Sequence, residues 1–367
     1  GASIDVLAGM TGTIDYRGYI DRYLKPGGDL LKGISVPGGL QEPELSNLSP
    51  EDRASYLNGL SDAVKLSIVQ TALFAQIKTT AAKAAAAPEN DRTAIYQVGF
   101  DAIKTLYPST TYSGNLALVF SQIKSLAGGD INLTVPGGSI DVGLAGNLGG
   151  IRKEADELGI VVQQQGTMNA LVLNDFNVNQ SRVFTMGGGD ISIWSSKGNI
   201  DAGKGAKSAI SAPPPVTSVD QNGNIITIFP PIVSGSGIQA ITPVIKDAKQ
   251  GNVYLAAPAG VVNGGEAGIR GGQVVIAATA VVGASNIQAS GGTIGVPTAV
   301  TPPVVPSGVS GVAAGVAKAA GIAGSEIAAA NEAQANLANN TVLNAEVISY
   351  GQCSVQEVLA GKEGCGS

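Results

Sequence analysis

Residues 188–201 read Gly-Gly-Asp-Ile-Ser-Ile-Trp-Ser-Ser-Lys-Gly-Asn-Ile-Asp, and related units recur along the chain. Similar units begin at Gly128 and Gly251, and a weaker one begins at Gly272. In the first three units, an apolar residue of one strand-like piece is followed nine positions later by an apolar residue of a second (131 to 140, 191 to 200, 253 to 262). Short apolar alternation with glycine-rich corners, repeated along a chain, is typical of stacked strands.

One such unit cannot bury its apolar face alone, whereas stacked units can. The repeat therefore predicts a parallel β-helix, an all-β-dominated β-solenoid, in which Ile131, Ile191 and Val253 lie inside, one above another. Asp130 and Asp190 are expected at the corners, where glycine supplies unusual backbone angles and Asp tolerates them. Further strands are expected at 3–6, 160–163, 170–173 and 182–185.

The composition excludes several classes of protein. The chain has 367 residues, 51 glycines, no histidine and 14% charged residues, against about 25% in an average protein. Without histidine there is no His-dependent triad and no His metal ligand. A net charge of -6 argues against a nucleic-acid partner.

Because Gly1–Val6 lacks the features of a signal peptide, we expect a piece of a longer protein whose export signal lies upstream.

Residues 16–117 follow a different pattern and are expected to form an α-helical insertion. Ser49-Pro50 and Ser61-Asp62 are typical helix starts, and Pro88-Glu89 opens a third helix. A shorter helix is expected over 17–25. The helices are expected to pack on each other and on the flank of the solenoid, with binding to a partner or membrane as the alternative. The apolar sets are Leu66, Val69, Leu73 and Ile77 in a helix reaching about residue 86, and Ile95, Val98, Phe100, Ile103 and Leu106 in the next.

These patterns divide the chain into five parts. We expect a first β-helix coil (1–15), the helical insertion (16–117), the main β-helix with a proline-rich hairpin or loop at 212–236 (118–296), a low-complexity tether or polar helix (297–340), and a terminal strand with two cysteines (341–367).

Cys353 and Cys365 are the only cysteines, with eleven residues between them. With no histidine and no further cysteine, a zinc site is not expected. A disulfide closing this loop would stabilise the chain by about 3 kcal/mol and would imply an oxidising compartment. Two interpretations stay open: a structural staple, or a terminal loop that acts as a plug or hook.

Asp130, Asp141, Asp190 and Asp201 recur in the repeats, which raises calcium binding or paired-carboxylate catalysis as hypotheses. In these units Asp does not stand where the calcium-binding nonapeptide repeat requires it, so corner or capping roles are favoured.

Catalytic β-helix enzymes need carboxylates and basic residues clustered on one face, but Arg152, Arg182 and Arg270 show no clustering in sequence. No catalytic, cofactor-binding or metal-ligating residue is therefore assigned. Trp194 and Tyr254 occupy strand positions that face away from the inferred core. Packing under the proline-rich loop is favoured for them over sugar binding.

Two long blocks resemble a known family. Residues 188–207 look like a block in the C-terminal region of filamentous-haemagglutinin-like exoproteins, and residues 251–270 resemble the block that follows it. The stretch 3–9 is similar too, and the resemblance covers roughly 1–20 and 118–296. It implies a right-handed β-helix exported by two-partner secretion through a dedicated outer-membrane barrel of a Gram-negative bacterium.

Some surface-retained members of this family end in a cysteine pair, whose disulfide loop stays lodged in or below the barrel pore. Cys353 and Cys365 match that pattern by number, location and spacing. The family's N-terminal secretion domain is absent from this sequence, and the resemblance says little about the ligand.

The resemblance implies the C-terminal stalk and anchor of a secreted, outer-membrane-associated surface adhesin that supports cell–cell, host or biofilm-matrix adhesion, with a role in virulence. Its expected partners are the transporter barrel and an unknown polysaccharide or cell-surface ligand, with no nucleic acid and no cofactor. The alternatives are a secreted β-helix enzyme acting on polysaccharide, which a groove of clustered carboxylates would favour, and the stalk of a contact-dependent toxin-delivery protein, which needs a toxin domain.

Overall fold

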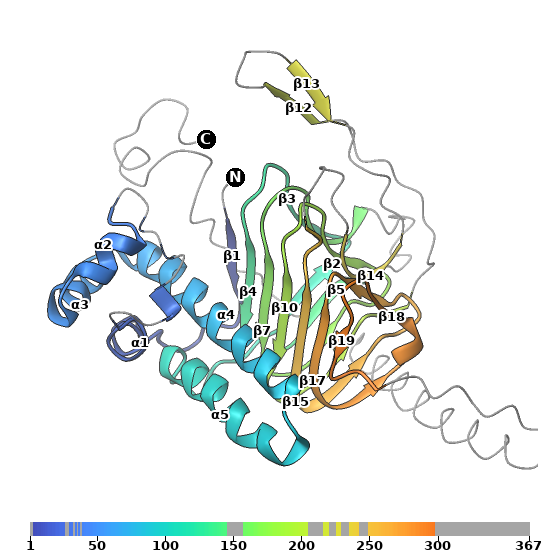
Figure 1. Ribbon diagram of the computed structural model, residues 1–367, viewed down its shortest axis with the longest axis horizontal. Helices are drawn as coiled ribbons and strands as arrows, with labels where there is room; N and C mark the ends of the chain where they lie inside the picture. The colour runs from blue at the N-terminus through green and yellow to red at the C-terminus, as the bar shows by residue number, and fades with distance from the viewer. Residues whose placement is uncertain are drawn as a thin grey trace, which may run out of the picture. The chain divides into compact units, whose positions relative to one another are not determined.

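A computed structural model describes residues 3–25, 29–31, 34, 36, 39–144, 157–204, 216–219, 225–228, 235–241 and 249–297. Within these residues the fold is strand-rich, and all but two of its strands form an 11-stranded and a 6-stranded sheet in which every pairing is parallel (Figure 1). The expected tether (297–340) lies outside the described residues except for its first residue, and the expected terminal strand lies wholly outside them.

The chain passes repeatedly through three rows of parallel strands. Row one contains β1 (Ile4–Leu7), β4 (Ile131–Val135), β7 (Met168–Val172), β10 (Ile191–Ser195), the first parts of β15 (Val253–Asn263) and β17 (Val274–Val282), and β19 (Thr293–Ile294). Row two contains β2 (Leu116–Val119), β5 (Ile140–Leu144), β8 (Phe176–Asn177), β11 (Ile200–Asp201) and the second parts of β15 and β17. Row three contains β3 (Gln122–Ser125), β6 (Gly159–Val162), β9 (Arg182–Thr185), β14 (Gly237–Ala240), β16 (Ile269–Gly271) and β18 (Ile287–Ala289), which follows the short 3-10 helix η3 (Ala284–Asn286).

The register stacks equivalent apolar residues of successive passes. Ile131 pairs with Met168, Met168 with Ile191, Ile191 with Val253 and Val253 with Val274, and all five are fully buried. All three rows contribute side chains to one hydrophobic core. The predicted stacking of Ile131, Ile191 and Val253 is therefore confirmed, as is the predicted strand-rich, parallel architecture.

Glycine is required where successive passes approach at a corner. A Cβ atom on Gly189 would lie 1.7 Å from the carbonyl oxygen of Gly166, and one on Gly251 would lie 1.9 Å from the oxygen of Gly189. Neighbouring strands lie about 4.8 Å apart, which leaves no room for a side chain directed along the stack. The glycine at each of these two corners is thus partly a consequence of backbone contact.

The helices occupy residues 16–106. They are α1 (Tyr16–Tyr23), the 3-10 helix η1 (Asp29–Leu31), α2 (Glu42–Asn47), α3 (Pro50–Asn58), α4 (Asp62–Ala86) and α5 (Glu89–Leu106). Ser49 caps α3, because its hydroxyl accepts the Asp52 N–H at 3.1 Å. The predicted starts of α3, α4 and α5 and the predicted end of α4 are confirmed; α2 was not predicted.

The predicted apolar face of α4 is buried, and that of α5 is confirmed except at one residue, since Leu106 is buried and Ile95, Phe100 and Ile103 pack against the same hydrophobic cluster. Leu66, Val69, Leu73 and Ile77 are at most 5% exposed. In α5, however, Val98 is 48% exposed. The buried residues of α5 are Tyr96, Gly99, Ala102 and Leu106. Gly99 lies within this face, and its lack of a side chain allows the helix to approach Trp194 closely.

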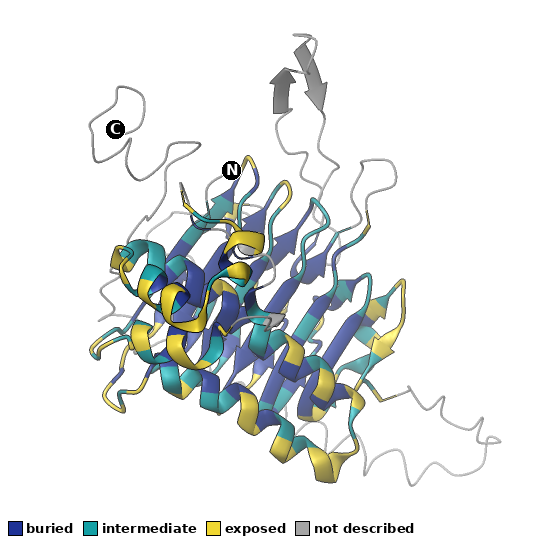
Figure 2. Cartoon of the chain, turned by 60° about the vertical axis from the view of Figure 1, so that its left-hand side comes forward, coloured by how far each residue is buried: buried dark blue, intermediate teal, exposed yellow. Residues whose placement is uncertain are grey.

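The helical layer packs on the outer face of row one (Figure 2). One hydrophobic cluster joins the helices to outward side chains of the strands, which are Leu171, Trp194, Ala256, Val275 and Ala277. Figure 1 shows α4 crossing in front of these strands. Between residues 212 and 236, β12 (Val216–Val219) and β13 (Ile225–Ile228) pair antiparallel, so the predicted hairpin is present.

Candidate functional site

Both predicted anchor residues, Cys353 and Cys365, lie outside the described residues. Their roles as staple or hook therefore stay predictions. Of the predicted candidate positions that the structure describes, the recurring carboxylates and the two outward aromatics all lie on or beside the parallel rows.

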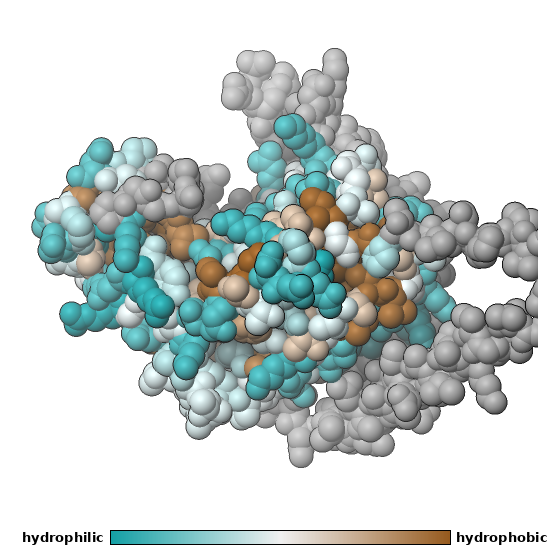
Figure 3. All heavy atoms as spheres, turned by 60° about the horizontal axis from the view of Figure 1, so that its bottom comes forward, coloured by the Kyte–Doolittle hydropathy of each residue, from teal (hydrophilic) through white to brown (hydrophobic). Residues whose placement is uncertain are grey.

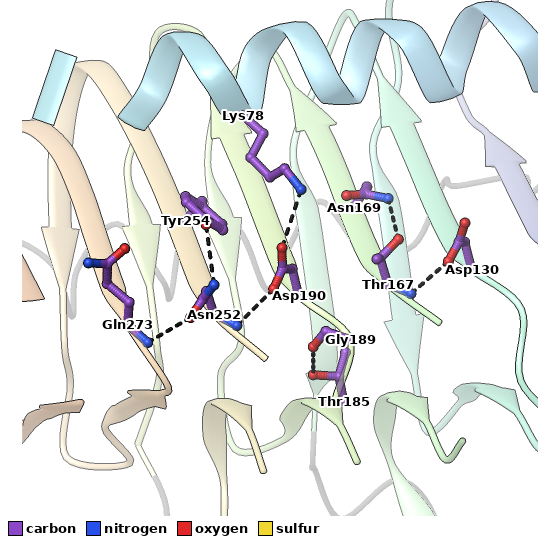
Figure 4. A network of polar contacts seen from close by, with 10 residues as sticks. All are labelled: Lys78, Asp130, Thr167, Asn169, Thr185, Gly189, Asp190, Asn252, Tyr254 and Gln273. Carbon is purple, nitrogen blue, oxygen red and sulfur yellow. Dashed lines mark hydrogen bonds and ion pairs between the residues drawn. The ribbon is translucent and has the colours of Figure 1, made fainter. Parts of the chain in front are cut away.

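The carboxylates at the start of row one connect neighbouring passes. Asp130 Oδ1 accepts the Thr167 N–H at 2.7 Å, and Asp190 Oδ1 accepts the Asn252 N–H at 2.9 Å (Figure 4). The predicted corner and capping role is confirmed. The reason given for it was incomplete, because neither Asp has a positive φ. The carboxylates instead satisfy backbone N–H groups that would otherwise lack a partner.

On the outer face of row two, carboxylates alternate with amides from strand to strand. Asn177 Nδ2 donates to Asp141 Oδ1 at 3.0 Å, and Asn263 Nδ2 donates to Asp201 Oδ2 at 3.1 Å. Burial raises the pKa of Asp141, which the hydrogen bond from Asn177 partly offsets. Within the described ranges there is no group of three or more Asp, Glu, Cys or His placed to hold a metal ion. This ladder is a structural device that joins the passes.

The two described arginines of the predicted set lie on row three without meeting. Arg182 aligns with Gly237, whereas Arg270 aligns with Gln239, two residues further along the same strand. Arg152 lies outside the described residues.

Trp194 faces away from the core, as predicted, but its cover was predicted wrongly. Among the described residues, the aromatic contacts of its ring come from α5: the ring centroids of Phe100 and Tyr96 lie 5.6 and 6.2 Å away, both edge-to-face. Only 1% of Trp194 is exposed. It therefore joins α5 to row one, and it is not available to a ligand.

Tyr254 is the outward aromatic that stays partly exposed, and it lies beside α4. Lys78 Nζ lies 5.5 Å from the centroid of its ring and 3.2 Å from Asp190 Oδ2. Asn252 Nδ2 donates to the Tyr254 hydroxyl at 3.4 Å. Figure 4 shows these four side chains converging under α4. The ion pair and the hydrogen bond hold the lysine and the ring in a fixed arrangement.

A hollow of about 390 Å³ lies next to this arrangement. Its lining residues are Lys78, Thr79, Ala82, Lys83, Ala86 and Tyr254. The hollow combines an aromatic ring, methyl groups and two lysines, of which Lys78 is paired with Asp190. Sequence reasoning singled out Tyr254 but missed the helix residues, since nothing in the repeat indicates which helix covers it.

The outer surface is otherwise mixed. On the face shown in Figure 3, apolar residues form separate small groups among hydrophilic ones. In the described part of the chain, the exposed large hydrophobic side chains are Val98, Leu126 and Val282. None of the described helices combines the length and the apolar character needed to cross a membrane.

Comparison with known proteins gives one match. Residues 188–298 match the family described as "Filamentous haemagglutinin family outer membrane protein". The matched segment contains both blocks that carry the resemblance, so the resemblance is confirmed over these residues. No curated protein and no solved structure matches the chain.

Proposed function

We propose that the chain is the C-terminal stalk and anchor region of a secreted bacterial surface adhesin. The match of residues 188–298 to filamentous haemagglutinin family outer membrane proteins supports a surface protein of this general kind. The proposal assigns no reaction to the chain.

The stalk role rests chiefly on one observation, the continuous register of row one. Between β4 and β17, each strand of row one pairs in parallel with the next, with equivalent residues in line. This register supports a parallel β-helix, and the right-handed sense is what the family resemblance implies. In a stack of this kind each pass contacts mainly its neighbours, so passes add length without adding width. Such a structure is suited to holding a binding region at a distance from the cell.

The anchor role rests on the cysteines and on the family resemblance. A disulfide between Cys353 and Cys365 would form a compact loop too bulky to pass the pore of the transporter barrel. The chain would then be exported by two-partner secretion but retained at the outer membrane. Binding to host cells, to neighbouring bacteria or to a biofilm matrix would make the retained protein an adhesin.

Surface exposure tests this proposal. Intact cells of the native host are treated with protease, and the protein is detected with antibodies raised against residues 1–367. We expect digestion on intact cells, and protection when the outer-membrane transporter is inactivated. A periplasmic marker that stays intact is the control for cell integrity. Protection in wild-type cells, or digestion that does not depend on the transporter, would overturn the proposal.

A further inference from the structure

The hollow beside Tyr254 exists because α4 carries small residues where it passes that ring. Ala82 and Ala86, one helical turn apart, line the hollow with methyl groups only. Tyr254 supplies an aromatic surface on the sheet side, and its hydroxyl is held by Asn252. The hollow is shallow, and Thr79 and Lys83 on its rim are exposed. A ligand can therefore enter from the side and need not be a chain end.

The charges of the hollow are unequal. Lys78 is neutralised by Asp190, whose Oδ2 lies 3.2 Å from its ammonium group. Lys83 lies in the last turn of α4, with no ion pair among the described residues. Among the described residues, Lys83 is thus the lysine of the hollow that has no ion pair, although the whole chain carries a net charge of -6.

We propose that this hollow binds an acidic sugar residue within a polysaccharide chain. A pyranose ring offers a C–H face to the Tyr254 ring and to the methyl groups of Ala82 and Ala86. Its hydroxyl groups suit the polar rim at Thr79, and its negative group pairs with Lys83. This combination of aromatic surface, apolar recess and lysine matches a sugar acid better than a neutral sugar. A neutral sugar would have no charged group to pair with Lys83.

The inference names a ligand class for the adhesin proposed above. Only its biological meaning rests on that proposed function, because binding by the hollow can be measured without it. Binding is tested on the purified chain and retention on cells, so the two proposals can fail separately.

The experiment is a calorimetric titration of the purified full chain with a short oligogalacturonate. The matched neutral probe is the same oligomer with its carboxyl groups methyl-esterified. We expect the acidic oligomer to bind, and to bind less tightly at high ionic strength because exposed charges are screened. The ester should bind about fivefold more weakly or not at all, since one charge-assisted contact is lost.

Two variants locate the site. Lys83→Ala should weaken binding of the acidic oligomer about fivefold, whereas Lys104→Ala should leave it unchanged. Lys104 is the matched control because it is also exposed and lies in the last turn of α5. Ala82→Leu should abolish binding by filling the hollow, and Leu is itself a good helix former. Its far-ultraviolet circular dichroism should match that of the wild type.

Three results would overturn the inference. They are failure of the acidic oligomer to bind, equal binding of the acidic and esterified oligomers, and equal loss of affinity in Lys83→Ala and Lys104→Ala. Equal binding of the two oligomers would make binding independent of charge. Equal loss in the two variants would place the binding outside this hollow.

Discussion

Gly99 determines how closely α5 approaches the sheet, and replacing it with alanine has two opposing effects. A Cβ atom at this position would lie 2.7 Å from Cη2 of Trp194 and 3.2 Å from its Cζ2 and Cζ3 atoms. Alanine in a helix interior gains about 0.5–1 kcal/mol over glycine. Overpacking a close contact costs about 1–3 kcal/mol. Because Trp194 is only 1% exposed and is held between ring contacts, we expect the second effect to win. Gly99→Ala should lower the free energy of unfolding by about 1 kcal/mol.

The same substitution in a Trp194→Phe background is the control. The three contacted atoms belong to the six-membered ring of the indole, which extends beyond the reach of phenylalanine. Gly99→Ala should then stabilise the protein by about 0.5–1 kcal/mol, as in an unobstructed helix. Urea denaturation followed by circular dichroism measures all four proteins, and emission from the single tryptophan reports on its burial in the two that retain it. Equal stabilisation in both backgrounds would refute the packing of α5 on Trp194.

Three further predictions test the stack. Ile191→Ala should cost about 2–5 kcal/mol of unfolding free energy in urea, and Lys197→Ala, on an exposed corner of the same pass, less than about 0.5 kcal/mol; similar losses would contradict the inward stacking. Asp190→Ala should lower thermal stability more than Asp190→Asn, by about 1 kcal/mol, since an amide oxygen can still accept the backbone N–H of the next pass; equal losses would assign the effect to the ion pair alone. Burial raises the pKa of Asp5 above 3.8, so the native state holds this proton to higher pH than the unfolded state and stability should fall as pH rises from 3.8 through the native pKa. Asp5→Asn should flatten that part of the stability–pH curve. An unchanged slope would contradict the conclusion that burial disfavours the charged form of Asp5.

The stacked strands could be predicted because the repeat marks them with glycine and aspartate. One pass, formed by β7, β8 and β9, was recognised only as strands between copies. It has Gly166 and Thr167 where the units at Gly128 and Gly188 have a glycine pair and Asp, although Met168 takes the place of Ile191 in the core. The physical requirement is only for little bulk at the corner and an apolar residue inside, and more than one sequence satisfies it.

The helical cover could be predicted only in part. The pattern located α3, α4 and α5 but not the surface on which they pack, since that depends on contacts between residues distant in sequence, such as Gly99 and Trp194. Val98 lies off the face of α5 that is buried, whose residues Tyr96, Gly99, Ala102 and Leu106 stand three or four positions apart, and this explains the wrong prediction for Val98. The hollow could not be predicted either, because Ala82 stands in a run of alanines, which indicates only helix formation.

Surface retention of the Cys353→Ser/Cys365→Ser double variant in the native host tests the central claim most directly. Cells and medium are separated, and the protein is measured in each with the same antibodies. The anchor account predicts that the double variant is exported and folded, and that it moves from the cell fraction into the medium. Retention of the double variant on the cell at the wild-type level would contradict the account and would leave the cysteines with a structural role only.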